Sequence, residues 1–257
     1  MGDNWKTYAR YKALNGLPES PLLQSLEELI QQTELYDLLE FSHKYVKKNG
    51  RYHCNPLRLS LYSSDLRMTS PFLKKGFACF SKILIGMKGA SDFKKLKTSF
   101  MEFPREDLQY LVLGIEMNEH IEKSRLKIYS GYWLSYSKVS HYLLRAELSL
   151  NGELVHSRYD SCSVANSRTK LRLRNVPREL SSEFFSEVFF QGNSLHFMIN
   201  GVEKDRAWKL VRKMMPARSI RDRLSTMIAN GFHLFAMRVQ RQEIQKNDLR
   251  SFTLYFR

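Results

Sequence analysis

Polar and apolar residues alternate with a period of two in several short stretches of the chain. The alternation is clearest at residues 58–62, 125–129 and 170–174, and it returns at residues 253–257. Successive side chains of a strand point to opposite faces of a sheet, so each stretch is predicted to be a strand with one apolar and one polar face. The polar face combines cations with tyrosines: Arg58, Tyr62, Arg125, Lys127, Tyr129, Arg172, Tyr255 and Arg257.

Apolar residues at helical spacing lie between these predicted strands. They predict helices over residues 22–39, 71–87, 92–101, 139–144, 206–215 and 220–229. Further strands are predicted over residues 40–46, 110–117, 195–199 and 232–238. Asn49-Gly50 is typical of a hairpin turn, whose return strand is predicted at residues 57–62. Residues 232–238 and 251–257 are predicted to form a last hairpin. Gly231 is typical of a helix C-cap, and residues 148–166 are interpreted as loop. No linker rich in Pro, Gly or Ser divides the chain, so residues 1–257 are predicted to form a single domain.

The chain is strongly basic, with a formal net charge of +15 and a pI of about 9.7. Such a charge attracts nucleic acid, a membrane surface or a diphosphate. The cations are interleaved with apolar residues and form no run of five or six, which favours folded faces over a nucleic-acid-binding arm. No apolar run reaches the ~18 residues that span a bilayer, and no signal peptide is evident. We therefore expect a cytoplasmic protein that binds neither nucleic acid nor membrane.

The polar strand faces have two interpretations. They can be the solvated side of a sheet whose other side carries helices. Alternatively, if the strands close into a barrel with the helices outside, the cations and tyrosines line its interior. That interior would suit a diphosphate, because each charge-assisted hydrogen bond contributes roughly 1.5–3 kcal/mol. Aromatic walls could also shield an allylic carbocation through their ring faces.

Four stretches carry a resemblance to a known family by their order and spacing. The first runs from Leu-Leu-Glu-Phe-Ser-His-Lys at 38–44 through Asn-Gly-Arg at 49–51 to residues 58–62, and the second is Asp-Phe-Lys-Lys-Leu at 92–96. The third is Gly-Ile-Glu at 114–116 followed by residues 124–129. The fourth is the end of the chain, from the helix around Arg221 to the strand at 254–256. In these stretches the chain resembles the cyanobactin-type peptide prenyltransferases, a branch of the ABBA prenyltransferases.

The resemblance implies an α/β fold in which an antiparallel barrel of about ten strands, built from repeated α-β-β-α units, is surrounded by helices. It implies an enzyme that transfers a dimethylallyl or longer isoprenyl group from its diphosphate to a side chain of a ribosomally made, linear or macrocyclic peptide. By position, the family's diphosphate-binding residues match Arg58, Arg125 and Lys127, with Tyr129, Arg172 and Tyr255 as further candidates, and Glu40 matches its catalytic base.

No cofactor is expected to be bound by a protein motif. The chain has no Asp-Asp pair and no metal-clamping carboxylate motif, so the cations would neutralise most of the diphosphate charge, and magnesium could accompany the diphosphate itself. The three cysteines form no CxxC pair, and no GxxxxGK or GxGxxG loop occurs.

Two other classes of function stay open. Residues 143–189 depart from the pattern of the resembling family, which fits a catalytically inactive relative that binds a peptide without transfer. The basic charge also fits a nucleic-acid-binding module, provided that the cations lie on an outer face beside exposed aromatic rings.

Overall fold

The structure, a computed structural model, describes most of the chain in two compact units. The described residues are 3–17, 19, 21–54, 57–65, 69–85, 90–104, 107–118, 123–133, 141–163, 185–199, 204–246 and 248–257. The first unit comprises Met1–Phe41, Asn55–Trp133 and Leu143–Arg158, and the second comprises Ser42–Cys54, Leu134–Tyr142 and Tyr159–Arg257.

Helices and strands account for most of the described residues. The helices are α1 (Asp3–Asn15), α2 (Pro21–Ile30), α3 (Thr69–Ile85), α4 (Ala90–Met101), α6 (Lys204–Met214), α7 (Arg218–Ala229) and α8 (Arg241–Gln245), with a 3-10 turn η1 (Thr33–Leu35). The strands are β1 (Leu38–Lys48), β2 (Arg51–Cys54), β3 (Leu57–Ser63), β4 (Leu108–Met117), β5 (Arg125–Trp133), β6 (His141–Ser149), β7 (Leu154–Ser163), β8 (Phe185–Gln191), β9 (Ser194–Ile199), β10 (Leu234–Gln240) and β11 (Ser251–Phe256). None of the helices in these ranges combines the length and the apolar character needed to cross a membrane.

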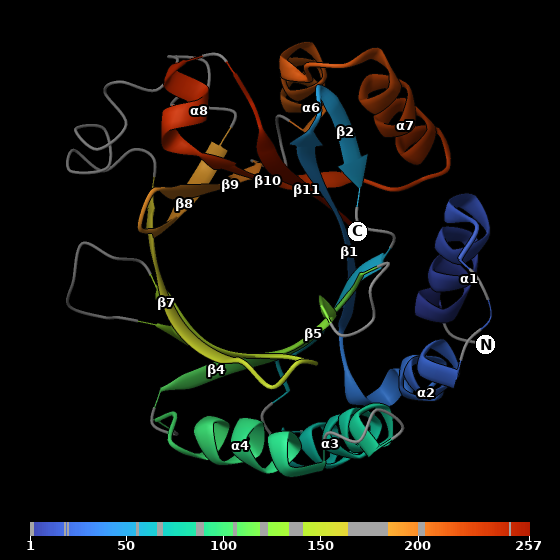
Figure 1. The fold of residues 1–257 in the computed structure, drawn as a ribbon, viewed down its shortest axis with the longest axis vertical. Helices are drawn as coiled ribbons and strands as arrows, with labels where there is room; N and C mark the ends of the chain where they lie inside the picture. Colours follow the sequence, from blue (N-terminus) through green and yellow to red (C-terminus); the bar gives the residue numbers. More distant parts are fainter. Residues whose placement is uncertain are drawn as a thin grey trace. The chain divides into compact units, whose positions relative to one another are not determined.

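All strands belong to one sheet, drawn in Figure 1. Their order is β11-β10-β9-β8-β7-β6-β5-β4-β3-β1-β2, and β11 also pairs with β1. Ten strands thereby close into an antiparallel barrel, and β2 is an additional strand that pairs with β1. With the seven helices of the described residues around it, this barrel confirms the fold class expected from the sequence.

In the first unit, helices cover the apolar face of the sheet. Figure 1 shows α3 and α4 lying along β4. Gly76 of α3 comes so close to β4 that a Cβ atom at this position would lie 2.1 Å from Cδ1 of Leu113. Leu61 of β3 and Ile128 of β5 are in register with Leu113, and the side chains of all three residues are buried. The apolar face predicted from the alternation is therefore the face that packs on the helices.

The second unit follows the same alternation. Phe197 of β9, Met237 of β10 and Leu254 of β11 are in register and fully buried. The predicted turn at residues 49–50 joins β1 and β2, and Asn49 and Gly50 both adopt positive φ angles, of 49° and 75°. The return strand of this hairpin is β2 and not residues 57–62, which belong to β3 and pair with the start of β1. The last two strands, β10 and β11, pair with each other as predicted.

Two predictions between residues 139 and 166 are wrong. The segment interpreted as a helix over 139–144 belongs to β6 where the structure describes it, and most of the segment interpreted as loop forms β7. Along β6, Arg145, Glu147 and Ser149 alternate with Leu144, Ala146 and Leu148. This is strand periodicity, but the consecutive Leu143 and Leu144 also fit one turn of an apolar helix face, and pairing within the sheet decides between the two.

Other boundaries also differ from the predictions. The helix expected over 22–39 ends at Ile30, because the chain enters η1 and then β1 at Leu38. The sequence patterns did not indicate α1, α8, β2 or β8. The predicted strand at 170–174, including Arg172, lies outside the described residues.

The close approach of Tyr110 to Gly131 allows a test of the sheet packing. A Cβ atom at Gly131 would lie 2.3 Å from Cζ of the Tyr110 ring, whereas one at Gly114 would lie 3.4 Å from Cβ of Lys127, an ordinary contact. We predict that Gly131→Ala lowers the free energy of unfolding by about 1–3 kcal/mol, because the ring or the strand must move. Gly114→Ala should leave it unchanged or raise it by about 0.4–1 kcal/mol. Urea unfolding measures both, and an equal loss in the two variants would contradict the packing.

Candidate anion site on the polar face of the sheet

The strand register places three of the predicted site residues beside one another. Arg58 of β3, Glu116 of β4 and Arg125 of β5 form one row across the sheet, and Lys127 follows Arg125 on the same face of β5. This face is opposite the helix-covered face in the first unit. The sequence alternation therefore predicted correctly that Arg58, Arg125 and Lys127 share a face.

Glu116 links two of these cations. Its Oε2 atom lies 2.5 Å from Nζ of Lys127 and 3.2 Å from Nε of Arg58. The side chains of Glu116 and Lys127 are each 6% exposed, and that of Arg58 is 11% exposed. The carboxylate thus supplies the counter-charge that a buried ammonium and a buried guanidinium require.

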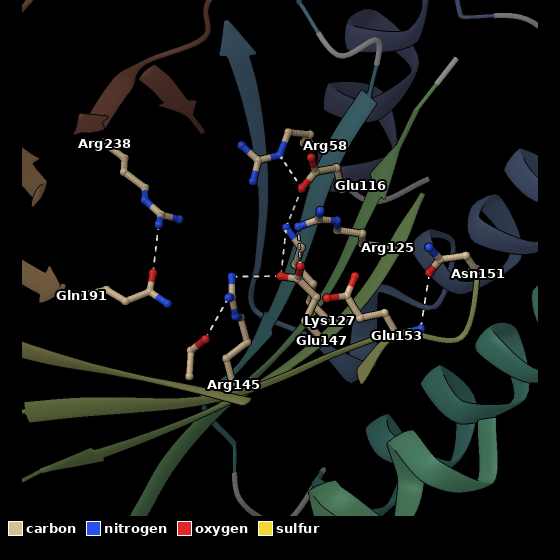
Figure 2. A network of polar contacts seen from close by, with 11 residues as sticks. Arg58, Glu116, Arg125, Lys127, Arg145, Glu147, Asn151, Glu153, Gln191 and Arg238 are labelled. Atoms are coloured by element: carbon tan, nitrogen blue, oxygen red, sulfur yellow. Dashed lines mark hydrogen bonds and ion pairs between the residues drawn. The ribbon is translucent and has the colours of Figure 1, made fainter. Parts of the chain in front are cut away.

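Glu147 of β6 links three cations (Figure 2). Its Oε1 atom lies 2.6 Å from Nη1 of Arg125, and its Oε2 atom lies 2.9 Å from Nη1 of Arg145 and 3.7 Å from Nζ of Lys127. Arg145 also donates a hydrogen bond of 2.9 Å to Oγ of Ser157 on β7. We call the set Arg58, Glu116, Arg125, Lys127, Arg145 and Glu147 the cation cluster.

Burial and neighbouring charges shift two pKa values in the cluster. Burial alone would raise the pKa of Glu147, but the charges of Lys127, Arg145 and Arg125 outweigh it and hold that pKa below its ordinary value. Burial lowers the pKa of Lys127, and the Arg58 charge acts in the same direction, against Glu116 and Glu147. A further anion beside Lys127 would favour its charged form.

Lys127 retains unused hydrogen-bond donors. Among the described residues it makes one hydrogen bond, to Glu116, and its distance of 3.7 Å from Glu147 is too long for a second. An ammonium has three donors. The residue opposite Lys127 on β4 is Gly114, which has no side chain to take them up. Arg125 is 41% exposed, and Glu147 is its one partner among the described residues. The cluster can therefore donate several more hydrogen bonds to an anion.

Glu40 lies in the neighbouring row. The register runs from Glu40 of β1 through Ser60 and Gly114 to Lys127, so two strands separate Glu40 from Lys127 on the same face. At the usual spacing of about 4.8 Å between strands, their Cα atoms are about 14 Å apart. Glu40 is buried and accepts a hydrogen bond of 2.7 Å from the hydroxyl of Tyr62.

Tyrosine rings lie on the polar face beside these groups. Tyr129 follows Lys127 on β5, and its ring borders the position that a side chain at Gly114 would occupy. The rings of Tyr62 and Tyr110 are 6.3 Å apart between centroids. Aromatic rings and cations therefore share this face, as the sequence predicted.

Tyr255 belongs to the second unit, and the structure gives it different neighbours. Its ring stacks on His196 with centroids 4.6 Å apart, and Phe235 approaches at 6.2 Å. Arg238 of β10 donates a hydrogen bond of 2.8 Å to Gln191 (Figure 2). It donates a second one, of 3.1 Å, to Ser194. Arg172 lies outside the described residues.

Three members of the cluster were not among the predicted site residues. Glu116 was part of a recognised motif but was given no role, and Arg145 and Glu147 fell in the segment whose structure was predicted wrongly. The period-two pattern of Arg145, Glu147 and Ser149 is the sequence signal that could have placed them on a strand face. Among the described residues, no three His, Cys, Asp or Glu side chains form a group that could hold a metal ion.

A comparison of the sequence with models of known families and with curated proteins gives no match. The function is therefore inferred from the barrel, the cation cluster and the resemblance described above.

The pairing of Glu147 predicts an acid-dependent stability. Its pKa in the folded protein is below the ordinary 4.5, so its contribution is fully present above that pH and is lost as the pH falls through the lower folded value. We predict that Glu147→Gln lowers the free energy of unfolding by about 3–5 kcal/mol at pH 7, because three cations lose their shared counter-charge.

Urea unfolding of both proteins from pH 7 to pH 3 measures this difference, which should shrink below about pH 4. Glu153→Gln is the matched control, because Glu153 is exposed on the same β6–β7 hairpin and, within the described residues, forms no side-chain ion pair. A difference that stays constant across this pH range would contradict the role of the Glu147 charge.

Proposed function

We propose that this chain transfers an isoprenyl group from its diphosphate to a side chain of a peptide. The proposal rests mainly on Lys127. Its buried ammonium lies among three arginines on one face of a closed barrel, and it has hydrogen-bond donors that no described residue uses. This is a site for a multiply charged anion with several acceptor oxygens. The resemblance to peptide prenyltransferases supports an isoprenyl diphosphate as that anion, dimethylallyl diphosphate in the first instance.

The cations would stabilise the negative charge of the leaving group. When the bond between the allylic carbon and the diphosphate oxygen breaks, the diphosphate leaves with the electron pair and gains negative charge. Lys127, Arg58, Arg125 and Arg145 are held by neighbouring side chains before the ligand binds, so little reorganisation is needed to stabilise that charge. Magnesium, if it accompanies the diphosphate, would add to the same neutralisation.

The acceptor side would be served by Glu40 and the tyrosines. The allylic carbon forms its new bond to a nucleophilic atom of the peptide, which loses a proton as it does so. Glu40 would take this proton, and Tyr62, which donates to its carboxylate, would orient it. Because two strands separate Glu40 from Lys127, its charge would face the acceptor rather than the diphosphate.

Mass spectrometry of a mixed peptide pool incubated with dimethylallyl diphosphate tests the proposal. We expect a gain of one isoprene unit on one type of side chain. Lys127→Ala should weaken binding of a non-hydrolysable donor analogue by about 1.5–3 kcal/mol, the contribution of one charge-assisted hydrogen bond. A protein that binds the analogue but modifies no peptide would be a binding-only relative, and one whose affinity does not change in Lys127→Ala has its donor site elsewhere.

The role of Glu40 gives a separate prediction. Glu40→Gln keeps the shape of the side chain and can still accept a hydrogen bond from Tyr62, but it cannot take a proton at neutral pH. We expect turnover to fall by about 10²–10⁴ with unchanged affinity for the donor analogue. Steady-state kinetics with the best peptide acceptor, alongside binding of the analogue, measures both quantities. Turnover at the wild-type rate would show that Glu40 is not the base.

A further inference from the structure

Glu147 occupies the place among the cations where an anionic ligand would be expected. Its two carboxylate oxygens contact three cations that come from β5 and β6, much as two oxygens of a phosphate group would. The side chain is 3% exposed, and within the described residues the polar contacts of its carboxylate are with Arg125, Lys127 and Arg145. A carboxylate in this position stabilises the protein without ligand, and it also repels any anion that approaches the same cations.

We propose that Glu147 is a built-in counter-anion, which stabilises the empty cation cluster and thereby limits its affinity for a diphosphate. This inference rests on the proposed function, because it takes the diphosphate as the ligand of the cluster. It assigns Glu147 as a positioning residue, which acts through the cations and not on the reacting atoms.

The three cations differ in how much they depend on Glu147. Lys127 is also bound by Glu116, and Arg145 also donates to Ser157. Arg125 has Glu147 as its one partner among the described residues, and it is the most exposed of the three. Replacing Glu147 by glutamine should therefore leave Lys127 and Arg145 near their present positions and make Arg125 available to a ligand.

Removing the Glu147 charge should tighten the binding of an anion. Glu147→Gln removes one negative charge a few ångströms from the bound ligand, in a partly buried site where the interaction is weakly screened. We expect the dissociation constant for inorganic pyrophosphate to fall about ten- to a hundredfold. A residue that served the fold alone would weaken the binding when replaced, or leave it unchanged.

Isothermal titration of the full chain with inorganic pyrophosphate at constant ionic strength provides the test, with Glu153→Gln as the matched control. Glu153→Gln removes the same charge from an exposed position on the β6–β7 hairpin (Figure 2) and should bind pyrophosphate as the wild type does. Glu147→Gln should bind it more tightly, melt at a lower temperature without ligand and show the larger rise in melting temperature with it. Equal or weaker binding by Glu147→Gln overturns the proposal.

The outcomes also separate this inference from the proposed function. Tight binding by Glu147→Gln with none by the wild type would support the role of Glu147 and contradict a donor site in the native protein. Binding by the wild type without tightening in Glu147→Gln would do the reverse. If Glu147→Gln is unfolded in buffer, pyrophosphate should restore its circular dichroism spectrum and thermal transition, and a variant that stays unfolded overturns the proposal.

Discussion

The alternation of side chains along antiparallel strands is the constraint on which both the core and the candidate site depend. Each strand sends every second side chain toward the helices and the others to the opposite face. The same strands therefore supply Leu61, Leu113 and Ile128 to the core and Arg58, Arg125 and Lys127 to the polar face. A shift of one residue in the register would exchange the two sets, which would bury cations against helices and expose the core. Stability and site geometry are thus set by the same pairing.

The buried cations on that face need negative counter-charges, and two glutamates supply them. Four cations within reach of one another repel, and each of them loses hydration when it is buried. Glu116 and Glu147 join strands β3 to β6 into one network, so that every cation of the cluster contacts a carboxylate. The network holds the cations in fixed positions, which in the proposed reaction would favour rapid stabilisation of the leaving diphosphate. It also occupies donors that a ligand would use. Affinity for an anion and stability without one are therefore in opposition at this site.

The arrangement would separate the two charge requirements of the proposed prenyl transfer. The leaving group needs positive charge, whereas the acceptor needs a base that would be neutralised if it lay among the cations. Glu40 lies in the same row as Lys127 but two strands away, and its carboxylate accepts a hydrogen bond from the hydroxyl of Tyr62. Gly114 lies in the row between them and the ring of Tyr129 borders it, so in the proposed reaction an aromatic ring would lie beside the allylic group.

The sequence by itself determined the strands at residues 58–62, 125–129 and 253–257, the turn at Asn49-Gly50, most of the helices and the shared face of Arg58, Arg125 and Lys127, because these follow from local periodicity and turn chemistry. It did not determine β6, where consecutive leucines fit either a helix or a strand until pairing decides, or β7, which was predicted as loop. Nor could it pair Lys127 with Glu116 and Glu147, since these contacts depend on which strands are neighbours and in which register. Local patterns specify which face a side chain occupies, whereas the partner that it meets across the sheet is a property of the closed tertiary structure alone.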